Sequence, residues 1–248
     1  MIDWHSHILN GIDDGAIDME SSISMATSLA ATGFTEVYCT PHLIMGCYEA
    51  GNDLVRQSVA ELQLNLGMKG ISLTLHPGRE YCLDEHLLTC LEDPLPLGDS
   101  NSILVELVPR IPIDMVRHLL SEVVRAGFTP VIAHPERCYL LAPPIRRTTS
   151  RDIIGRLKSL ITGGKRGANA QDQPEMEENL LLSYLRDLGC AFQGNLGSFT
   201  GLYGRQVKTL AETFFRERIY DRFGSDLHAP EQAETILSAI PLMFGGQR

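Results

Sequence analysis

Single histidine, aspartate and glutamate residues close successive apolar runs in this chain, and together they could bind a cluster of divalent cations. The first two form a His-x-His pair, His5 and His7. Side chains two residues apart on a strand project from the same face, so both imidazoles can grip one cation. Later apolar runs end at further candidate ligands, namely His42, Glu80, Glu106, His134, Asp226 and His228. This mixture of imidazoles and carboxylates suits manganese, iron or zinc better than calcium or magnesium.

The elements that must position these side chains alternate between strand and helix. Strands are predicted near residues 2–5, 36–40, 71–76, 102–106, 130–134, 191–195 and 219–225. Apolar residues at helical spacing, each stripe ending close to a glycine, predict helices over residues 21–32, 112–126 and 178–188. This alternation indicates an α/β fold, either a parallel barrel or a doubly wound sheet. The barrel is favoured because it gathers the ends of many strands at one rim.

The chain is expected to form one domain over residues 1–248. It has 44% hydrophobic residues, which is enough for one sizeable core. Residues 140–176 are rich in turn-forming and polar residues, and a helix is predicted within them over residues 152–161. We interpret residues 140–176 as a peripheral insertion between two barrel strands.

The charge and hydropathy of the chain limit its expected partners. The formal net charge is -10, which opposes nonspecific attraction to nucleic acid or anionic lipid. No apolar run approaches the length needed to cross a bilayer, and the amino terminus lacks the pattern of a signal peptide. We therefore expect a soluble, cytoplasmic protein that binds no nucleic acid and does not insert into a membrane. The sequence leaves open whether it forms a homo-oligomer.

Several familiar enzyme signatures are missing. None of the six cysteines is followed six positions later by the arginine that thiol-based phosphatases need. The run at 163–166, Gly-Gly-Lys-Arg, lacks the earlier glycine and the final serine or threonine of a P-loop, and Gly197-Ser198-Phe199 does not make a nucleophile elbow. These three signatures are therefore excluded by the sequence.

Five segments resemble the polymerase and histidinol phosphatase (PHP) superfamily. They are Asp3 to Gly15, Thr40-Pro41-His42, Gly78 to Tyr81, His134 to Arg137, and Ser225 to His228. The Gly-Ile-Asp-Asp-Gly extension at 11–15 is similar to the bacterial protein-tyrosine phosphatase branch, which is associated with capsular and exopolysaccharide synthesis. The resemblance implies a PHP-type, distorted (β/α)7 barrel that holds three metal ions, most often manganese, with iron or zinc as alternatives.

The resemblance also assigns roles to individual residues. The implied metal ligands are His5, His7, Asp14, His42, Glu80, Glu106, His134, Asp226 and His228. Asp13 is an alternative to Asp14, and His76 is interpreted as a residue at a strand end rather than a ligand. Glu80 is the expected metal bridge.

Arginines are the expected phosphate-binding residues. Arg137 has a planar fork that suits the nonbridging phosphate oxygens. The alternative is a salt bridge from Arg137 to Asp99 or Glu136. The family's usual arginine beyond the final Asp-x-His is missing, and Arg205 could replace it or could simply be an exposed residue at a helix start. Asn10 also replaces a usual proline, and these departures bear on substrate preference more than on hydrolysis.

The function that the resemblance implies is metal-dependent hydrolysis of phosphotyrosine in proteins. The implied substrate is the tyrosine-rich tail of a bacterial tyrosine autokinase that controls capsular and exopolysaccharide synthesis. Two alternatives remain: a small-molecule phosphomonoesterase such as a histidinol phosphatase, and a regulator of the kinase that keeps metals only for folding.

Overall fold

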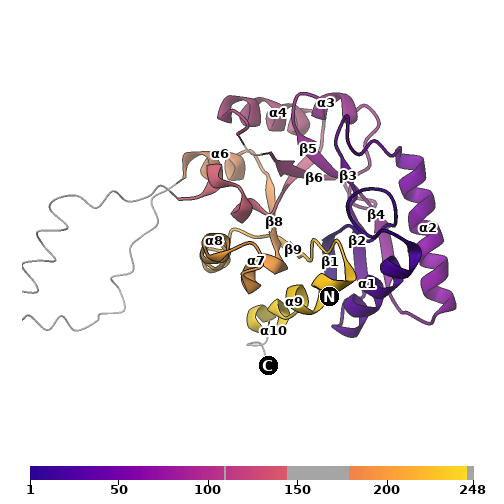
Figure 1. Cartoon of the computed structure of the whole chain (residues 1–248). Helices are drawn as coiled ribbons and strands as arrows, with labels where there is room; N and C mark the ends of the chain where they lie inside the picture. Colours follow the sequence, from indigo (N-terminus) through magenta and orange to yellow (C-terminus); the bar gives the residue numbers. More distant parts are fainter. Residues whose placement is uncertain (109, 144–178, 245–248) are drawn as a thin grey trace, which may run out of the picture.

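The computed structural model describes residues 1–108, 110–143 and 179–244. Strands alternate with helices along most of this range (Figure 1). The strands are β1 Ile2–Ser6, β2 Glu36–Cys39, β3 His42–Leu43, β4 Thr74–Pro77, β5 Glu80–Leu83, β6 Ser102–Leu107, β7 Thr129–Ala133, β8 Ala191–Asn195 and β9 Arg222–Gly224. The α-helices are α1 Met19–Ala31, α2 Asn52–Met68, α3 Leu87–Cys90, α4 Ile113–Arg125, α6 Leu180–Asp187, α7 Leu196–Thr200, α8 Arg205–Arg216, α9 Ala233–Leu237 and α10 Ala239–Phe244. Three 3-10 turns are η1 Pro135–Arg137, η2 Tyr139–Leu141 and η3 Pro230–Gln232.

The strands form two parallel sheets. One has the order β1-β2-β4 and the other has the order β3-β5-β6-β7-β8-β9. The sheets meet where two strands are interrupted: β2 continues into β3 past Pro41, and β4 continues into β5 past Gly78 and Arg79. If each interrupted pair counts as one strand, the nine strands of the described ranges become seven.

The sheets are also linked at their other ends, where β1 meets the segment after β9. The Asp226 backbone N–H donates to the His5 carbonyl at 2.7 Å, and the His7 N–H donates to the Leu227 carbonyl at 3.0 Å. The prediction of an α/β fold with parallel strands is confirmed. The closed seven-stranded barrel stays a prediction, which these links between the two sheets support.

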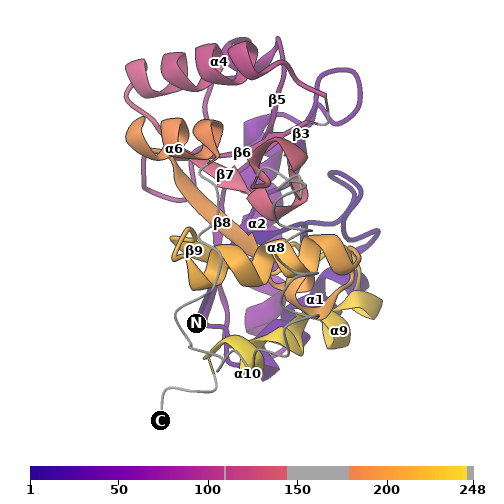
Figure 2. The ribbon, with the colours of Figure 1, turned by 90° about the vertical axis from the view of Figure 1, so that its left-hand side faces the viewer.

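Helices cover the outside of the strands. In Figure 2, α4, α6 and α8 follow one another across one side of the larger sheet. Residues at helical spacing in α4 are buried there, namely Val116, Leu119, Leu120 and Val123, and they share a core cluster with outward-facing residues of β5 to β8. A second cluster joins α1 and α2 to β2 and β4. Because strand side chains alternate, the opposite face of the same strands is left to position the candidate site.

The end of the strands remote from the candidate ligands is filled by stacked side chains. The Trp4 and Tyr38 rings lie 4.4 Å apart and nearly parallel, and the Arg222 guanidinium lies 4.4 Å from the Trp4 ring centroid. Tyr38 also stacks on His76, whose Nε2 lies 2.9 Å from a Glu36 carboxylate oxygen. His76 therefore serves this stack, and none of the groups of candidate metal ligands in the described residues contains it.

The predicted elements are largely present, with differences at the interrupted strands. The strand expected near 71–76 begins at Thr74, and β3 and β5 were not predicted as separate strands. The three predicted helices correspond to α1, α4 and α6. Most of the expected insertion at 140–176, including the helix predicted over 152–161, lies outside the described residues. No helix in the described ranges is both long enough and apolar enough for a bilayer crossing.

Candidate metal centre

Three overlapping groups of side chains bring candidate ligand atoms within 4.8 Å of one another. The groups are His7, Asp14, His42 and His228; His5, His7 and Glu80; and His42, Glu80 and Glu106. His5 and Glu106 lie near the carboxyl ends of β1 and β6, and His7, Asp14 and His228 lie in the loops after β1 and β9. His42 and Glu80 begin β3 and β5, just past the ends of β2 and β4. The structure therefore brings together seven of the nine residues that the sequence assigned to the metal site, and the other two, His134 and Asp226, contact the same cluster.

Glu80 lies at the centre of the cluster and is fully buried. Its Oε2 atom is 3.1 Å from His5 Nε2, 3.2 Å from His7 Nε2 and 3.1 Å from His42 Nδ1. None of these contacts satisfies hydrogen-bond geometry, so Glu80 Oε2 and His42 Nδ1 are buried without a hydrogen-bond partner. Buried polar atoms normally have partners, and ligand atoms that face a common cation meet in this way. The residues therefore fit a metal ion.

The charges of the cluster also fit cations. Burial opposes ionisation, yet the surrounding imidazoles, His5 foremost, hold the pKa of Glu80 well below its usual value. Burial likewise lowers the pKa of His5, but Glu80 and Asp226 outweigh it and raise this pKa to about 9. The carboxylates thus require neighbouring positive charge, which protons on His5 and His7 provide in the metal-free protein and bound cations can provide instead.

The adjacent aspartates Asp13 and Asp14 have different surroundings. Asp13 is hydrogen-bonded throughout: Oδ2 lies 2.6 Å from His7 Nδ1 and accepts the His42 backbone N–H, and Oδ1 accepts the Gly15 N–H. Burial raises the pKa of Asp13, but the hydrogen bond and charge of His7 outweigh burial and lower this pKa to about 2. The Asp14 side chain is 49% exposed and lies 3.7 Å from His42 Nε2 and 3.6 Å from His228 Nε2. This geometry favours Asp14 as a ligand and Asp13 as the residue that orients His7.

Glu106 and His134 complete the side of the cluster formed by β6 and β7. His134 Nε2 lies 3.1 Å from Glu80 Oε1 and 3.8 Å from Glu106 Oε1. Burial and the nearby Glu80 charge raise the pKa of Glu106 to about 7. A bound cation would remove this penalty because it favours the ionised carboxylate.

Two of the candidate ligands have left-handed backbone conformations. The φ angles are 31° at His134 and 53° at Asp226, in a region that few non-glycine residues occupy and that His and Asp enter more readily than most. Such conformations are costly and concentrate at functional sites. Close approach is also required nearby: a Cβ at Gly224 would lie 2.4 Å from the His5 Cβ, so only glycine lets β9 pack against β1 here.

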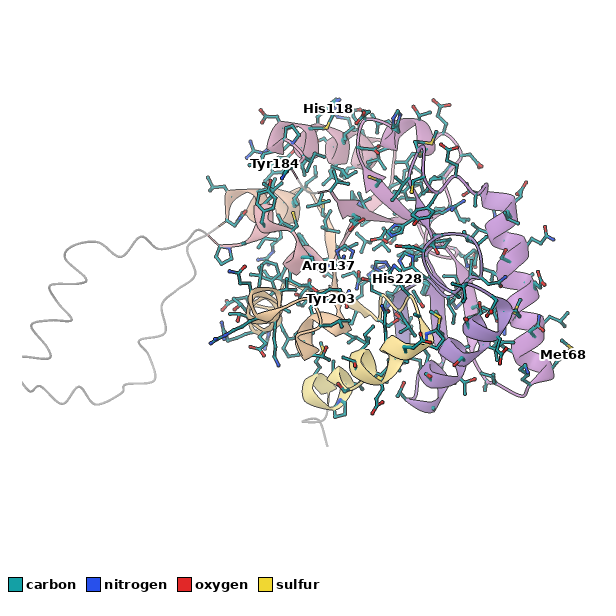
Figure 3. The ribbon with its side chains drawn as sticks, in the orientation of Figure 1. Met68, His118, Arg137, Tyr184, Tyr203 and His228 are labelled. Atoms are coloured by element: carbon teal, nitrogen blue, oxygen red, sulfur yellow. The ribbon has the colours of Figure 1, made fainter. Side chains whose placement is uncertain are left out.

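Arg137 lies beside the cluster, where Figure 3 labels it near His228. Its Nη1 donates to Asp226 Oδ2 at 2.7 Å. The alternative prediction of a salt bridge to Asp99 or Glu136 is therefore wrong, because the partner is Asp226. The Arg137 side chain is 32% exposed. Arg205, the other predicted substrate-binding residue, is exposed at the start of α8, and the described residues give its side chain no hydrogen bond or ion pair.

Several residues that support the site were not predicted from the sequence. Asn195, at the end of β8, donates from Nδ2 to Asp226 Oδ2 at 2.7 Å. Gln193 Oε1 lies 2.8 Å from His5 Nδ1 and orients that imidazole. The Tyr203 ring lies under the Arg137 guanidinium, 4.6 Å from its carbon atom. The alternation of β8 could have indicated that Gln193 and Asn195 share a face, but no sequence signal pointed to Tyr203.

A family model described as "Capsular polysaccharide synthesis, CpsB/CapC" matches residues 1–155. This range is well over half of the chain and contains seven of the nine candidate ligands. The chain belongs to the CpsB/CapC family. The match ends before β8, so Asn195, Tyr203 and the pair Asp226 and His228 lie beyond it.

Relatives of this CpsB/CapC protein are named as tyrosine-protein phosphatases. YwqE of Bacillus subtilis is 30% identical over 234 residues, which cover 92% of this chain and 77% of YwqE. CpsB of Streptococcus agalactiae is 28% identical over 139 residues, which cover 55% of this chain and 57% of that protein. A similar crystal structure comes from work on YwqE and on CpsB of Streptococcus pneumoniae, which are described there as metal-dependent tyrosine phosphatases. The aligned region covers 100% of this chain and 89% of the crystallised chain, with a TM-score of 0.72 and 28% identity.

A more distant neighbour shares only the fold. Histidinol phosphate phosphatase of Lactococcus lactis, solved with zinc, L-histidinol and phosphate, has a TM-score of 0.56 and 11% identity. The aligned regions cover 98% of this chain and 92% of that structure. The similarity supports a common architecture with the CpsB/CapC protein and carries no argument about substrate.

Proposed function

We propose that this CpsB/CapC protein is a metal-dependent phosphatase that hydrolyses phosphotyrosine in proteins. The observation that carries the proposal is the buried ligand cluster around Glu80 with Arg137 at its edge. A purely structural metal site has no need for a half-open side or for an arginine directed to it. The names of the relatives supply the substrate class.

The metal ligands are proposed to be the nine residues that the sequence indicated, with Asp14 rather than Asp13. Three manganese ions would suit the mixture of imidazole nitrogens and carboxylate oxygens, and iron or zinc could replace manganese. Divalent cations supply Lewis acidity and neutralise phosphate charge in such sites. Glu80, whose two oxygens face different histidines, is proposed as the bridging ligand.

The chain's own residues would bind and orient the phosphate. The solvent-facing side of the cluster contains Asp14, His42 and His228, whose side chains are 49%, 13% and 23% exposed. This side is where a phosphate group could enter. Arg137 would hold two nonbridging oxygens through the guanidinium N–H groups that do not bind Asp226, and so stabilise charge through the transition state.

The protein substrate is proposed to be the tyrosine-rich tail of a bacterial autokinase that controls polysaccharide assembly. Support comes from the family's association with capsular polysaccharide synthesis and from the resemblance in the sequence. A largely buried site that opens on one side suits a tail better than a folded surface, because an extended chain can bring a phosphotyrosine to the metals without rearrangement of either protein.

The test is a phosphatase assay with manganese, iron, zinc or magnesium on a phosphotyrosyl peptide and on histidinol phosphate. We expect turnover of the peptide with manganese. Turnover of histidinol phosphate alone would replace the proposal with a small-molecule phosphatase. A manganese-loaded protein that binds the kinase tail but hydrolyses no aryl phosphate would be a regulator instead.

A further inference from the structure

Arg137 is held from two directions. Its Nη1 donates to Asp226 Oδ2 at 2.7 Å, and its guanidinium carbon lies 4.6 Å from the centroid of the Tyr203 ring. Both residues are labelled beside one another in Figure 3. Within residues 1–108, 110–143 and 179–244, the only hydrogen bond of the guanidinium is the one to Asp226, so none of these residues competes with an anion for its other N–H groups.

The hydrogen bond to Asp226 alone cannot fix the plane of the guanidinium. A single N–H···O contact leaves the group free to rotate about the axis that joins the two atoms. Bidentate recognition of phosphate depends on this plane, because both N–H groups must face oxygens together. The Tyr203 ring, over which the guanidinium carbon lies, restricts this rotation because it occupies the space on one side of the group.

Tyr203 is itself fixed in place. It lies in the turn between α7 and α8, and its ring packs so closely on α7 that a Cβ at Gly197 would be 3.1 Å from Tyr203 Cε2. Its hydroxyl is a long 3.4 Å from Asn195 Nδ2. The ring, and not the hydroxyl, therefore makes the main contacts of this side chain.

Hydrogen bonds through Asn195 and Glu136 connect the surroundings of Tyr203 to the candidate metal ligands. Asn195 Nδ2 donates to Asp226 Oδ2 at 2.7 Å, and its backbone N–H donates to Glu136 Oε1 at 3.0 Å. Glu136 is buried, directly precedes Arg137, and also accepts hydrogen bonds from Ser198 and Tyr220. Both ends of Arg137 are thus tied to one hydrogen-bonded frame.

We propose that Tyr203 is a positioning residue, whose ring holds the Arg137 guanidinium in the plane that phosphate binding requires. This role rests on the proposed phosphatase function. It gives the turn between α7 and α8, which lies outside the part of the chain matched by the family model, an indirect influence on turnover. The ring acts through Arg137 and makes no contact with the reacting atoms.

The test compares Tyr203→Leu, which removes the ring, with Tyr203→Phe, which keeps it. With manganese-loaded protein and para-nitrophenyl phosphate, we expect Tyr203→Leu to lose roughly ten- to a hundredfold in kcat/KM. The manganese content of Tyr203→Leu should equal that of the wild type, and Tyr203→Phe should retain most of the wild-type activity. Loss of manganese from Tyr203→Leu, or activity within twofold of the wild type, would overturn the proposal.

A double variant separates positioning from general destabilisation. Tyr203→Leu should have no further effect on an Arg137→Ala background, because the group that it positions is gone. A second loss of the same size would show that the ring acts elsewhere. Tyr184→Leu is the matched control: Tyr184 stacks on Arg117 at 5.2 Å between α6 and α4, remote from the metal ligands, and its removal should leave kcat/KM unchanged (Figure 3).

Phosphate binding tests the role even if the proposed function fails. If the wild type hydrolyses no aryl phosphate, titration calorimetry with inorganic phosphate still measures how well Arg137 is presented. Tyr203→Leu should then bind phosphate at least tenfold more weakly than the wild type and Tyr203→Phe. Equal affinities would refute the positioning role independently of the reaction.

Discussion

Arg137 and Asp226 connect the candidate metal centre to the candidate phosphate site through one carboxylate. Asp226 Oδ2 accepts from Arg137 Nη1 at 2.7 Å, while Oδ1 lies 3.4 Å from the Nε2 atoms of both His5 and His7. The two oxygens therefore face different partners. Metal binding and phosphate binding should depend on each other through this residue.

The shared carboxylate predicts that Asp226→Asn impairs two functions together. The amide keeps one oxygen but loses the charge, so it weakens metal binding and also gives Arg137 a poorer partner. We expect substoichiometric manganese by elemental analysis and a loss of kcat/KM larger than that of Arg137→Ala. Full manganese content with wild-type turnover would contradict the shared role of Asp226.

His42→Ala and Arg137→Ala should separate metal binding from transition-state stabilisation. His42 is in two of the three ligand groups, so its removal should cost a metal ion and most of the activity. Arg137→Ala should retain its metals and lose about 10²–10³ in kcat, the usual effect of removing one preorganised donor. Metal analysis beside steady-state kinetics distinguishes the two, and an Arg137→Ala protein that lost manganese would place Arg137 among the supports of the metal site.

Much of this site could be predicted because its residue types recur where strands end. Alternation and strand ends predicted that His5, His7, Glu106 and His134 would converge without knowledge of the register, and the structure brings them together around Glu80. The choice of Asp14, with Asp13 as the alternative, came from the resemblance and not from the residue pattern, since neighbouring carboxylates differ only in direction. The short strand β3 was missed because two residues give no periodicity.

The residues around Arg137 were harder to predict for a different reason. Tyr203 and Asn195 meet Arg137 and Asp226 only after β7, β8 and β9 have paired in register. Such contacts join residues far apart in the sequence, and neither a tyrosine in a glycine-rich turn nor an asparagine at a strand end is distinctive by type. The Asp226 partner of Arg137 was missed for the same reason.

Gly224→Ala should destabilise the site through one close contact. The added Cβ would lie 2.4 Å from the His5 Cβ and 2.8 Å from the His5 backbone nitrogen, so β1 and β9 would have to separate. Overpacking of this kind typically costs about 1–3 kcal/mol. The thermal unfolding temperature and the affinity for manganese should both decrease. Gly127→Ala is a useful comparison, because its Cβ would meet no atom within 4 Å and only its positive φ would be strained.

The stability of the metal-free protein should fall as pH rises from 6.5 to about 9. Burial lowers the pKa of His5, but Glu80 and Asp226 outweigh it and raise this pKa from 6.5 to about 9, and the pKa of His7 is also raised. A group whose pKa is higher in the folded state stabilises the fold below its unfolded value, and this contribution is lost as pH rises through the folded value. Burial lowers the pKa values of His42, His134 and His228 below 6.5, so these groups make the opposite contribution, a gain in stability that is nearly complete about one pH unit above 6.5. The loss due to His5 and His7 should therefore be clearest in the upper part of the range.

Manganese should reverse this trend, because metal ligands must be deprotonated and binding therefore strengthens with pH. The measurement is the unfolding temperature of chelator-treated and manganese-saturated protein between pH 6.5 and 8.5, where about 1 kcal/mol corresponds to roughly 2–4 °C for a chain of this size. The difference in Tm between the two forms should widen as pH rises. A constant difference would mean that manganese does not compete with protons for His5 and His7, and that these two histidines are not metal ligands.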